Sequence, residues 1–191
     1  EIQAEWHALF TEDTPYISIN LSGRQLNDLQ LVSECKRILL ETGARPERII
    51  LEITESSLMY DIERNIEVLN QLGKLGLALA IDDFGTGYSS LSLLSRLPVR
   101  HLKIDNSFIE DMAYNKGNYA IVSAVISLAH ALGIKVIAEG VENIAQHDSL
   151  SALGCDSVQG YLFYHPMQES SLRELIFNPA GQRTIPATMQ N

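Results

Sequence analysis

Two adjacent aspartates, Asp82 and Asp83, follow an apolar run over residues 77–81 and precede a Gly-Thr-Gly turn at residues 85–87. A continuous apolar run of this length is typical of a strand covered on both faces, as in a parallel sheet. Neighbouring carboxylates at its end repel each other unless a cation, a proton or a basic side chain lies between them. The pair therefore indicates either a metal site or an ordinary turn with a helix cap.

The same arrangement recurs along the chain. Apolar segments of strand length each lead to a polar residue, and these polar residues are Asn20, Glu52, Asp82, Lys103, Glu139 and Gln159. They follow one another at intervals of 20 to 36 residues, the size of a βα unit. Alternating βα units predict an α/β fold with a parallel sheet and helices outside it. Because almost every strand end carries a polar group, the pattern favours a TIM-type (β/α)8 barrel over a doubly wound sheet.

About six βα units are expected, two fewer than a complete barrel has. Strands are predicted over residues 16–19, 48–51, 77–81, 101–102, 134–138 and 156–158. Helices are predicted over residues 26–42, 62–74, 91–94, 120–132 and 172–177. The shortfall lies at the amino terminus, where residues 1–10 look like the end of an amphipathic helix without a cap. We therefore expect one domain over residues 1–177 without its first strands, then a polar tail over residues 178–191.

Composition narrows the classes of protein. The 191 residues are 46% hydrophobic, enough for one sizeable core, and no apolar run approaches the roughly 20 residues that span a bilayer. The net charge of −10 argues against a nucleic-acid-binding surface, although divalent cations would admit a phosphate-bearing substrate. Cys35 and Cys155 lack metal-ligand spacing, which predicts reduced thiols and a cytoplasmic location. His130, within an apolar helix, is expected to pack in the core.

Six ordered motifs surround the polar strand ends. They are N-L-S-G-R-Q-L from Asn20, E-I-T-E from Glu52, D-D-F-G-T-G-Y-S-S from Asp82, K-I-D from Lys103, A-E-G-V-E from Ala138 and Q-G-Y from Gln159. Together they resemble the EAL-domain family of cyclic di-GMP phosphodiesterases, from about Trp6 to Ile176. The Glu-Ala-Leu element that names the family, and a nearby arginine that contacts a substrate phosphate, would lie before residue 1. Either the chain is a fragment of a longer protein or the protein has lost its first barrel strands, and we expect the fragment.

The resemblance implies a two-metal site for Mg²⁺ or Mn²⁺, hard cations that prefer oxygen ligands. Asn20, Glu52 and Asp82 would hold the first ion together with the upstream glutamate. Asp82 would bridge to the second ion, which Asp83 and Glu139 would also hold. Two metal ions bound close together activate a water and stabilise the charge that develops in an in-line phosphodiester displacement.

The resemblance also gives roles to residues near the metals. Lys103 would activate or orient the attacking water, and adjacent cations would lower its pKa. The alternative is a structural ion pair between Lys103 and Asp105. Glu55 would order the loop after Asp83, whose glycines let it turn. Asp105, Gln159 and Glu142 are assigned to substrate and cofactor binding at the rim. Gln159 would lie near the metals or the substrate, and Glu142 would have a supporting role. Either Gln159 or Glu142 could instead be a solvated loop residue.

The first hypothesis is therefore a phosphodiesterase that linearises cyclic di-GMP to pGpG in bacterial signalling. The alternative is a catalytically silent receptor that binds cyclic di-GMP and acts through a protein partner. A third is an unrelated barrel enzyme with Lys103 as base and carboxylate-bound Mg²⁺. The resemblance further implies a homodimer through the helices that follow Asp83 and Lys103, and an upstream sensory or GGDEF domain. Contact with nucleic acid or membrane is not expected.

Overall fold

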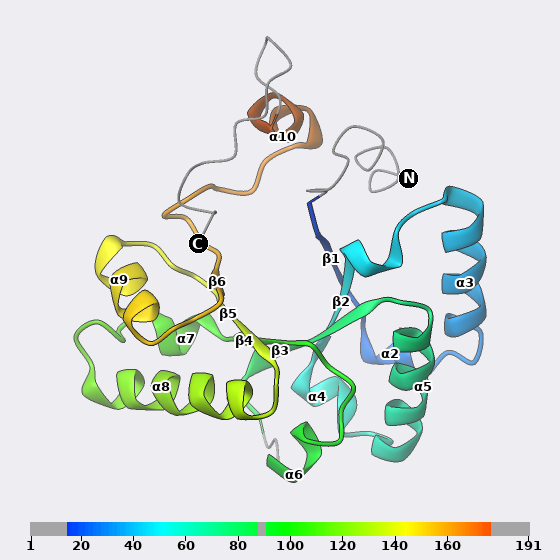
Figure 1. The fold of residues 1–191 in the computed structure, drawn as a ribbon, viewed down its shortest axis with the longest axis horizontal. Helices are drawn as coiled ribbons and strands as arrows, with labels where there is room; N and C mark the ends of the chain where they lie inside the picture. The colour runs from blue at the N-terminus through cyan, green and yellow to red at the C-terminus, as the bar shows by residue number, and fades with distance from the viewer. Residues whose placement is uncertain (1–14, 88–90, 177–191) are drawn as a thin grey trace.

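The computed structural model describes residues 15–87 and 91–176. Within these ranges six parallel strands form one sheet, and their order in space follows the sequence. The strands are β1 (Ile17–Asn20), β2 (Ile49–Thr54), β3 (Ala78–Phe84), β4 (His101–Ile104), β5 (Lys135–Ala138) and β6 (Ser157–Val158). The sheet curls into a half-barrel with helices outside it (Figure 1), which confirms the predicted TIM-type α/β fold of six βα units. The expected helix over residues 1–10 and tail over residues 178–191 lie outside the described residues.

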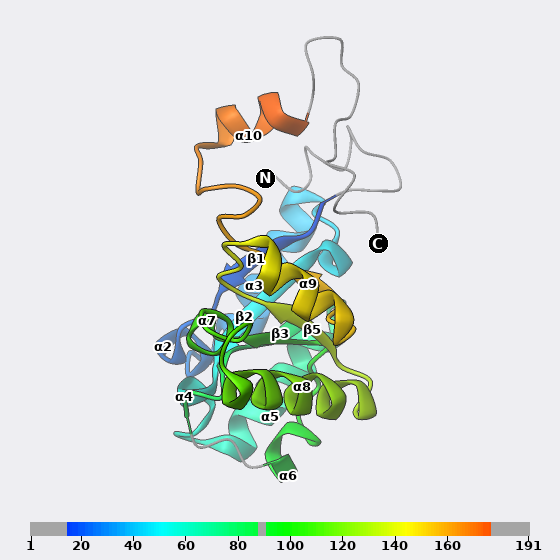
Figure 2. The ribbon, with the colours of Figure 1, turned by 90° about the vertical axis from the view of Figure 1, so that its left-hand side faces the viewer.

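Helices connect the strands and cover the outer face of the sheet. They are α2 (Gly23–Leu26), α3 (Leu31–Thr42), the 3₁₀ turn η1 (Pro46–Arg48), α4 (Glu55–Leu58), α5 (Ile62–Lys74), α6 (Leu91–Leu94), α7 (Asn106–Ile109), α8 (Lys116–Ala131), α9 (Ile144–Ala152) and α10 (Glu169–Ile176). Figures 1 and 2 show α10 standing apart from the sheet, beyond β6. Among the described helices, none combines the length and the apolar character needed to cross a membrane.

The helix predicted over residues 26–42 begins only at Leu31, and Leu26 belongs to a separate short helix. The helix α2 ends at Leu26 and α3 begins at Leu31. Between them, the Asp28 side chain accepts a hydrogen bond from the backbone N–H of Gln30, with N and Oδ1 2.9 Å apart. Short polar side chains that bond to nearby backbone in this way compete with helical hydrogen bonding. The apolar periodicity alone did not reveal this interruption.

Alternation along the strands decides which side chains reach the inside of the half-barrel. The main core lies between sheet and helices and includes Leu51, Leu79 and Leu102. The intervening side chains of β2 and β3 form a smaller inner cluster of Ile50, Ala78 and Ala80. Because successive side chains point to opposite faces, Glu52, Asp82 and Lys103 continue this inner series. Burial of each of these leucines stabilises the fold by about 2 kcal/mol. The strands are therefore held with their leucines toward the helices, and the alternate side chains point into the half-barrel.

Strands β2 and β3 continue three residues beyond their predicted ends at residues 51 and 81. Glu52 and Asp82 therefore lie within strands rather than after them. Thr54 pairs with Asp82 in the parallel register, so strand pairing extends through both acidic positions. The prediction ended each strand before its first acidic residue. A charged side chain on the inner face does not end a strand when it is paired with an opposite charge, as Glu52 and Asp82 are with Lys103.

Candidate active site

Lys103 lies at the centre of the polar inner face. Its Nζ is 2.7 Å from Glu52 Oε2, 3.0 Å from Asp82 Oδ1 and 2.7 Å from Glu139 Oε1. These four residues come from β2, β3 and β4 and from the position directly after β5. The Lys103 side chain is only 5% exposed. Four neighbouring strands thus bring three carboxylates around one buried ammonium, which we call the acidic cluster (Glu52, Asp82, Glu139, Lys103).

The carboxylates stabilise the charged form of Lys103. Burial acts to lower the pKa of this ammonium, but hydrogen bonds to Glu139, Glu52 and Asp82 outweigh burial and raise the pKa above its usual value. The protein's own groups thus act opposite to the lowering expected from adjacent metal ions. Lys103 does form an ion pair, as the structural alternative proposed, but with this cluster instead of Asp105.

Asp105 makes a local contact at the start of α7. Its Oδ1 accepts hydrogen bonds from the backbone N–H and the hydroxyl of Ser107, so Asp105 caps the amino terminus of α7. Such a cap fixes where β4 ends and α7 begins. The side chain thus has a local structural contact, and its charge also acts on nearby Asp83. The substrate and cofactor contact expected from the sequence stays a prediction.

Asp83 joins the cluster because the strand is irregular there. Asp83 has φ = 54°, a left-handed conformation that strains a non-glycine residue, and the pairing of β3 with β4 shifts register between Ile81 and Phe84. Regular alternation would direct Asp82 and Asp83 to opposite faces. Instead, Asp82, Asp83 and Glu139 each offer one oxygen, and these atoms all lie within 4.8 Å of one another.

This donor set suits a hard divalent cation. Burial, and secondarily the negative charge of Asp82, raise the pKa of Asp83. Burial also raises the pKa of Glu139, against the opposing effect of Lys103. For both groups neighbouring carboxylates add to the effect of burial, and Lys103 is the cation among these residues that opposes it. Converging carboxylates are the oxygen ligands that Mg²⁺ and Mn²⁺ prefer.

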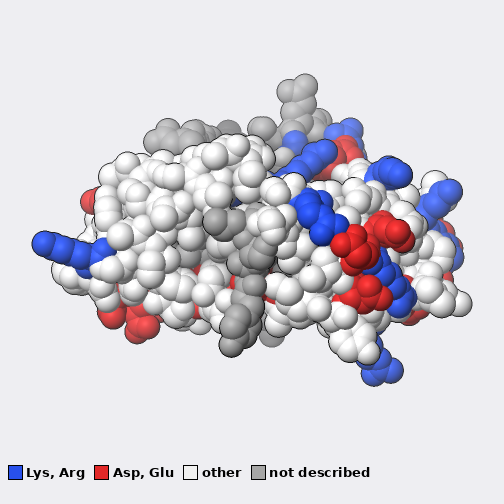
Figure 3. Space-filling model, turned by 90° about the horizontal axis from the view of Figure 1, so that it is seen from below, with Lys and Arg blue, Asp and Glu red and all other residues white. Residues whose placement is uncertain are grey.

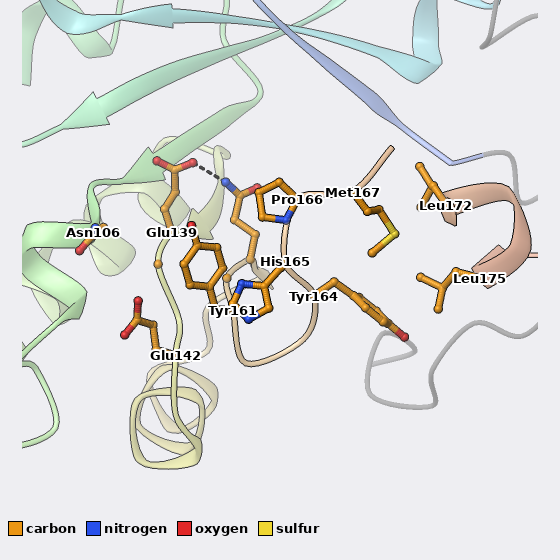
Figure 4. A pocket seen from close by; sticks show the side chains of 13 residues that line it. Asn106, Glu139, Glu142, Tyr161, Tyr164, His165, Pro166, Met167, Leu172 and Leu175 are labelled. Atoms are coloured by element: carbon orange, nitrogen blue, oxygen red, sulfur yellow. Dashed lines mark hydrogen bonds between the residues drawn. The ribbon is translucent and has the colours of Figure 1, made fainter. Parts of the chain in front are cut away.

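The remaining predicted residues lie around this cluster. Asn20 ends β1 and pairs in register with Glu52, so it occupies the adjoining position on the next strand. Gln159 follows β6, and its Nε2 donates a hydrogen bond to Glu139 Oε1 (Figure 4). Glu142 lies in the loop after β5, where its backbone N–H donates to Gln146 Oε1 at 2.7 Å. Its carboxylate faces a neighbouring cavity.

Glu55 lies beneath the glycine loop, as its predicted role requires. It begins α4, is 2% exposed, and accepts a hydrogen bond from Gly85 N at 3.4 Å. A methyl group added at Gly87 would come within 2.8 Å of Glu55 Oε1, so the loop rests directly on this carboxylate. Oε1 has no hydrogen-bond partner among the described residues.

A cavity of about 610 Å³ opens beside Glu139 and Gln159 (Figure 4). Sequence reasoning missed most of its lining residues, which include Asn106, Tyr161, Tyr164, His165, Pro166 and Met167. The rings of Tyr161 and His165 lie 4.3 Å apart between centroids, tilted by 35°. The aromatic residues that follow Gln159 in the sequence were the signal that could have revealed this wall.

The profile of the EAL domain family matches residues 2–166. The chain belongs to this family. A relative from Pseudomonas aeruginosa, the bifunctional diguanylate cyclase/cyclic di-GMP phosphodiesterase MucR, is 45% identical over 156 residues. That match covers 82% of the chain but only 23% of MucR, so the chain spans less than a quarter of this relative's length.

Solved structures of the family share the fold. The MucR phosphodiesterase in complex with c-di-GMP superposes with a TM-score of 0.82 at 40% identity, covering 90% of this chain and 72% of the other. Klebsiella pneumoniae BlrP1 in a manganese/cyclic di-GMP complex gives a TM-score of 0.75 at 33% identity, covering 84% of this chain and 41% of the other. The half-barrel therefore corresponds to part of an EAL domain.

Proposed function

We propose that this chain provides the catalytic centre of a metal-dependent phosphodiesterase that hydrolyses cyclic di-GMP to linear pGpG. The observation that carries the proposal is the convergence of Glu52, Asp82 and Glu139 on Lys103, with Asp83 beside them. Membership of the EAL family and the c-di-GMP bound to the similar MucR structure support this choice of substrate.

Two groups of residues would hold the ions. Asn20, Glu52 and Asp82 would hold one Mg²⁺ or Mn²⁺, and Asp82, Asp83 and Glu139 the other. In the family's pattern the first ion also takes the glutamate of the Glu-Ala-Leu element, which residues 1–191 do not contain. When bound, such ions lower the pKa of a coordinated water and neutralise charge on the reacting phosphate.

Lys103 would act as a positive hydrogen-bond donor. Lys103 Nζ lies within 3.0 Å of Glu52, Asp82 and Glu139, the proposed ligands of the ions, so Lys103 is placed to orient a water bound beside them. In the reaction the water gives a proton to solvent and its oxygen forms a bond to phosphorus. The bond from phosphorus to the ribose 3′ oxygen breaks, and that oxygen takes up a proton to become a hydroxyl. The product is linear pGpG with a 5′ phosphate.

The cavity beside Glu139 would receive part of the nucleotide. Flat bases stack on aromatic side chains, and Tyr161 and His165 present such a pair. Glu142 faces the same cavity, where a carboxylate can accept hydrogen bonds from the N–H groups of guanine. Gln159 would connect this side to the metal site through its hydrogen bond to Glu139.

The test is product analysis with the purified protein. Cyclic di-GMP is incubated with the protein and Mn²⁺, and the nucleotides are separated by chromatography. Formation of pGpG is the expected result. Nucleotide that binds but is recovered unchanged would support the receptor alternative, in which cyclic di-GMP binding acts through a protein partner.

We further propose that the protein forms a homodimer through its α6–α8 side. Between Lys116 and His130, α8 has no charged side chain, and its exposed positions include Ala120, Ile121 and Ala124. Figure 3 shows this largely uncharged face. A stable dimer buries about 800 Å² on each partner, which a 16-residue helix and its neighbours can supply. Sedimentation equilibrium would detect the dimer. We expect Ile121→Glu to be monomeric, and an Ile121→Glu variant that remains dimeric would contradict this interface.

A further inference from the structure

The segment that carries Glu139 is packed tightly on both sides. On one side, a methyl group added at Gly140 would lie 2.7 Å from Asn106 Cβ. On the other side, a methyl group added at Gly160 would lie 2.2 Å from Val141 O and 2.3 Å from Val141 N. Real side chains do not approach this closely, so both glycines allow contacts that no other residue permits without displacement of the chain.

Backbone hydrogen bonds hold the same segment. Glu139 N donates to Ile104 O at 3.2 Å, which joins the segment to the end of β4. On the β6 side, Val141 N donates to Gln159 O at 3.0 Å, and Gln159 N donates to Ala138 O at 2.9 Å. The backbone on either side of the Glu139 carboxylate is therefore attached to both neighbouring strands.

The Asn106 contact links this segment directly to Lys103. Asn106 begins α7, three residues after Lys103 in the chain, and Gly140 directly follows Glu139. The contact between Asn106 and Gly140 thus sets the separation of the two backbones from which Lys103 and Glu139 extend. The 2.7 Å distance between Lys103 Nζ and Glu139 Oε1 depends on that separation.

We propose that Asn106, Gly140 and Gly160 are positioning residues that clamp the Glu139 segment and thereby set the capacity of the acidic cluster to hold a divalent cation. The inference rests on the metal site of the proposed function. The clamp acts through Glu139: a displacement of this backbone moves the Glu139 carboxylate relative to those of Asp82 and Asp83, which belong to β3.

The chain offers a matched control for Gly140. Gly133 has φ = +71°, nearly the same as the +70° of Gly140, but an added methyl group there meets no atom within 4 Å. Gly133→Ala and Gly140→Ala therefore impose the same backbone strain. Only Gly140→Ala adds a collision, and Asn106→Gly removes the Cβ atom with which it collides. Asn106→Ala keeps that atom.

The experiment measures Mn²⁺ affinity of the full-length protein by electron paramagnetic resonance of free Mn²⁺, without nucleotide. We expect Gly133→Ala to bind like the wild type and Gly140→Ala to bind at least tenfold more weakly. Adding Asn106→Gly to Gly140→Ala should restore the affinity to within threefold, and adding Asn106→Ala should not. Thermal melting identifies any variant that is unfolded. If Gly140→Ala is unfolded, the clamp is tested by comparing Mn²⁺ binding of the double variants that carry Asn106→Gly or Asn106→Ala.

Equal affinities for Gly140→Ala and Gly133→Ala, or equal rescue by Asn106→Gly and Asn106→Ala, would overturn the clamp. A wild-type protein that binds no Mn²⁺ would overturn it together with the metal site. If the wild type binds Mn²⁺ and the variants behave as expected, but cyclic di-GMP is not hydrolysed, the clamp stands and the proposed reaction fails. The two failures are therefore distinguishable.

Discussion

Carboxylates at the two ends of strand β5 lie in opposite electrostatic environments. At the carboxyl end, burial raises the pKa of Glu139, and Lys103 only partly offsets it. Near the amino end, burial also acts to raise the pKa of Asp156, but the backbone N–H of Val136 and the ring of His130 outweigh burial and lower it. Both partners of Asp156 lie 2.8 Å from its Oδ2.

The difference separates a binding site from a structural contact. The ionised form of Asp156 is stabilised by donors of the folded chain, so this carboxylate contributes to stability. Glu139 is held near Asp82 and Asp83, where ionised carboxylates repel one another. A natural protein retains such crowding where function requires it, since removal of the charge would otherwise stabilise the fold. Four substitutions test this contrast.

The largest effect is expected for Asp82→Asn, which removes a charge from the centre of the acidic cluster. We expect hydrolysis of cyclic di-GMP to fall by about 10³-fold or more, because metal ions supply several kcal/mol of transition-state stabilisation. The fold should remain, because asparagine has nearly the same volume. Steady-state rates and circular dichroism check both statements; turnover near the wild-type rate would contradict the metal assignment.

Lys103→Met should lower the stability of the metal-free protein. Removing the ammonium leaves three carboxylates without their shared partner, and breaking a buried pair in this way costs about 3–5 kcal/mol. We expect the melting temperature of the metal-free protein to fall and Mn²⁺ to restore part of it, because the cation replaces the lost positive charge. A melting temperature insensitive to this substitution would show that the ion pairs contribute nothing.

Glu139→Gln should separate activity from stability. Activity is expected to fall by about 10²-fold, because a neutral amide replaces a proposed metal ligand. The melting temperature of the metal-free protein should stay the same or rise at pH 7, because the folded state disfavours the ionised carboxyl. Differential scanning calorimetry in EDTA measures this, and a clear loss of stability would contradict the contrast with Asp156.

Asp156→Asn should give the smallest effect and the opposite pattern. The substitution replaces the charged acceptor of two hydrogen bonds by a neutral amide. This should lower the free energy of unfolding by about 1 kcal/mol at pH 7 and leave activity unchanged. Because the pKa of Asp156 is lower in the folded state, its contribution is present above the unfolded value of about 3.9 and is lost as pH falls below it. The difference in melting temperature between variant and wild type should therefore shrink on acidification below pH 4.

Sequence periodicity predicted the arrangement of the strands because each apolar segment must be buried. Residues 62–74 are helical as expected, and the inward series of Glu52, Asp82 and Lys103 follows from the alternation of strand side chains. The prediction of His130 as a core residue was wrong: the side chain is 42% exposed and hydrogen-bonded to Asp156. The helix α8 is apolar on both faces, so composition could not distinguish its buried side.

Other features arise only from tertiary contacts. The sequence placed Asp82 and Asp83 at one site, but the register shift between β3 and β4 that accompanies this arrangement depends on strand pairing. The contact between Asn106 and Gly140 joins positions 34 residues apart, and a glycine in a loop reads as a simple turn until its neighbour is known. These are the places where pairing partners, rather than local preference, decide the geometry.

The most direct test of the proposed metal centre is a count of bound Mn²⁺ combined with turnover in the same preparation. The full-length protein is stripped with EDTA, and Mn²⁺ is added in steps while bound ions and pGpG are measured. We predict no turnover without Mn²⁺, and turnover that rises as two ions bind per chain. Hydrolysis that continues in EDTA, or saturation of Mn²⁺ binding with no product, would contradict the assignment of Asp82 as the shared ligand of a catalytic metal pair.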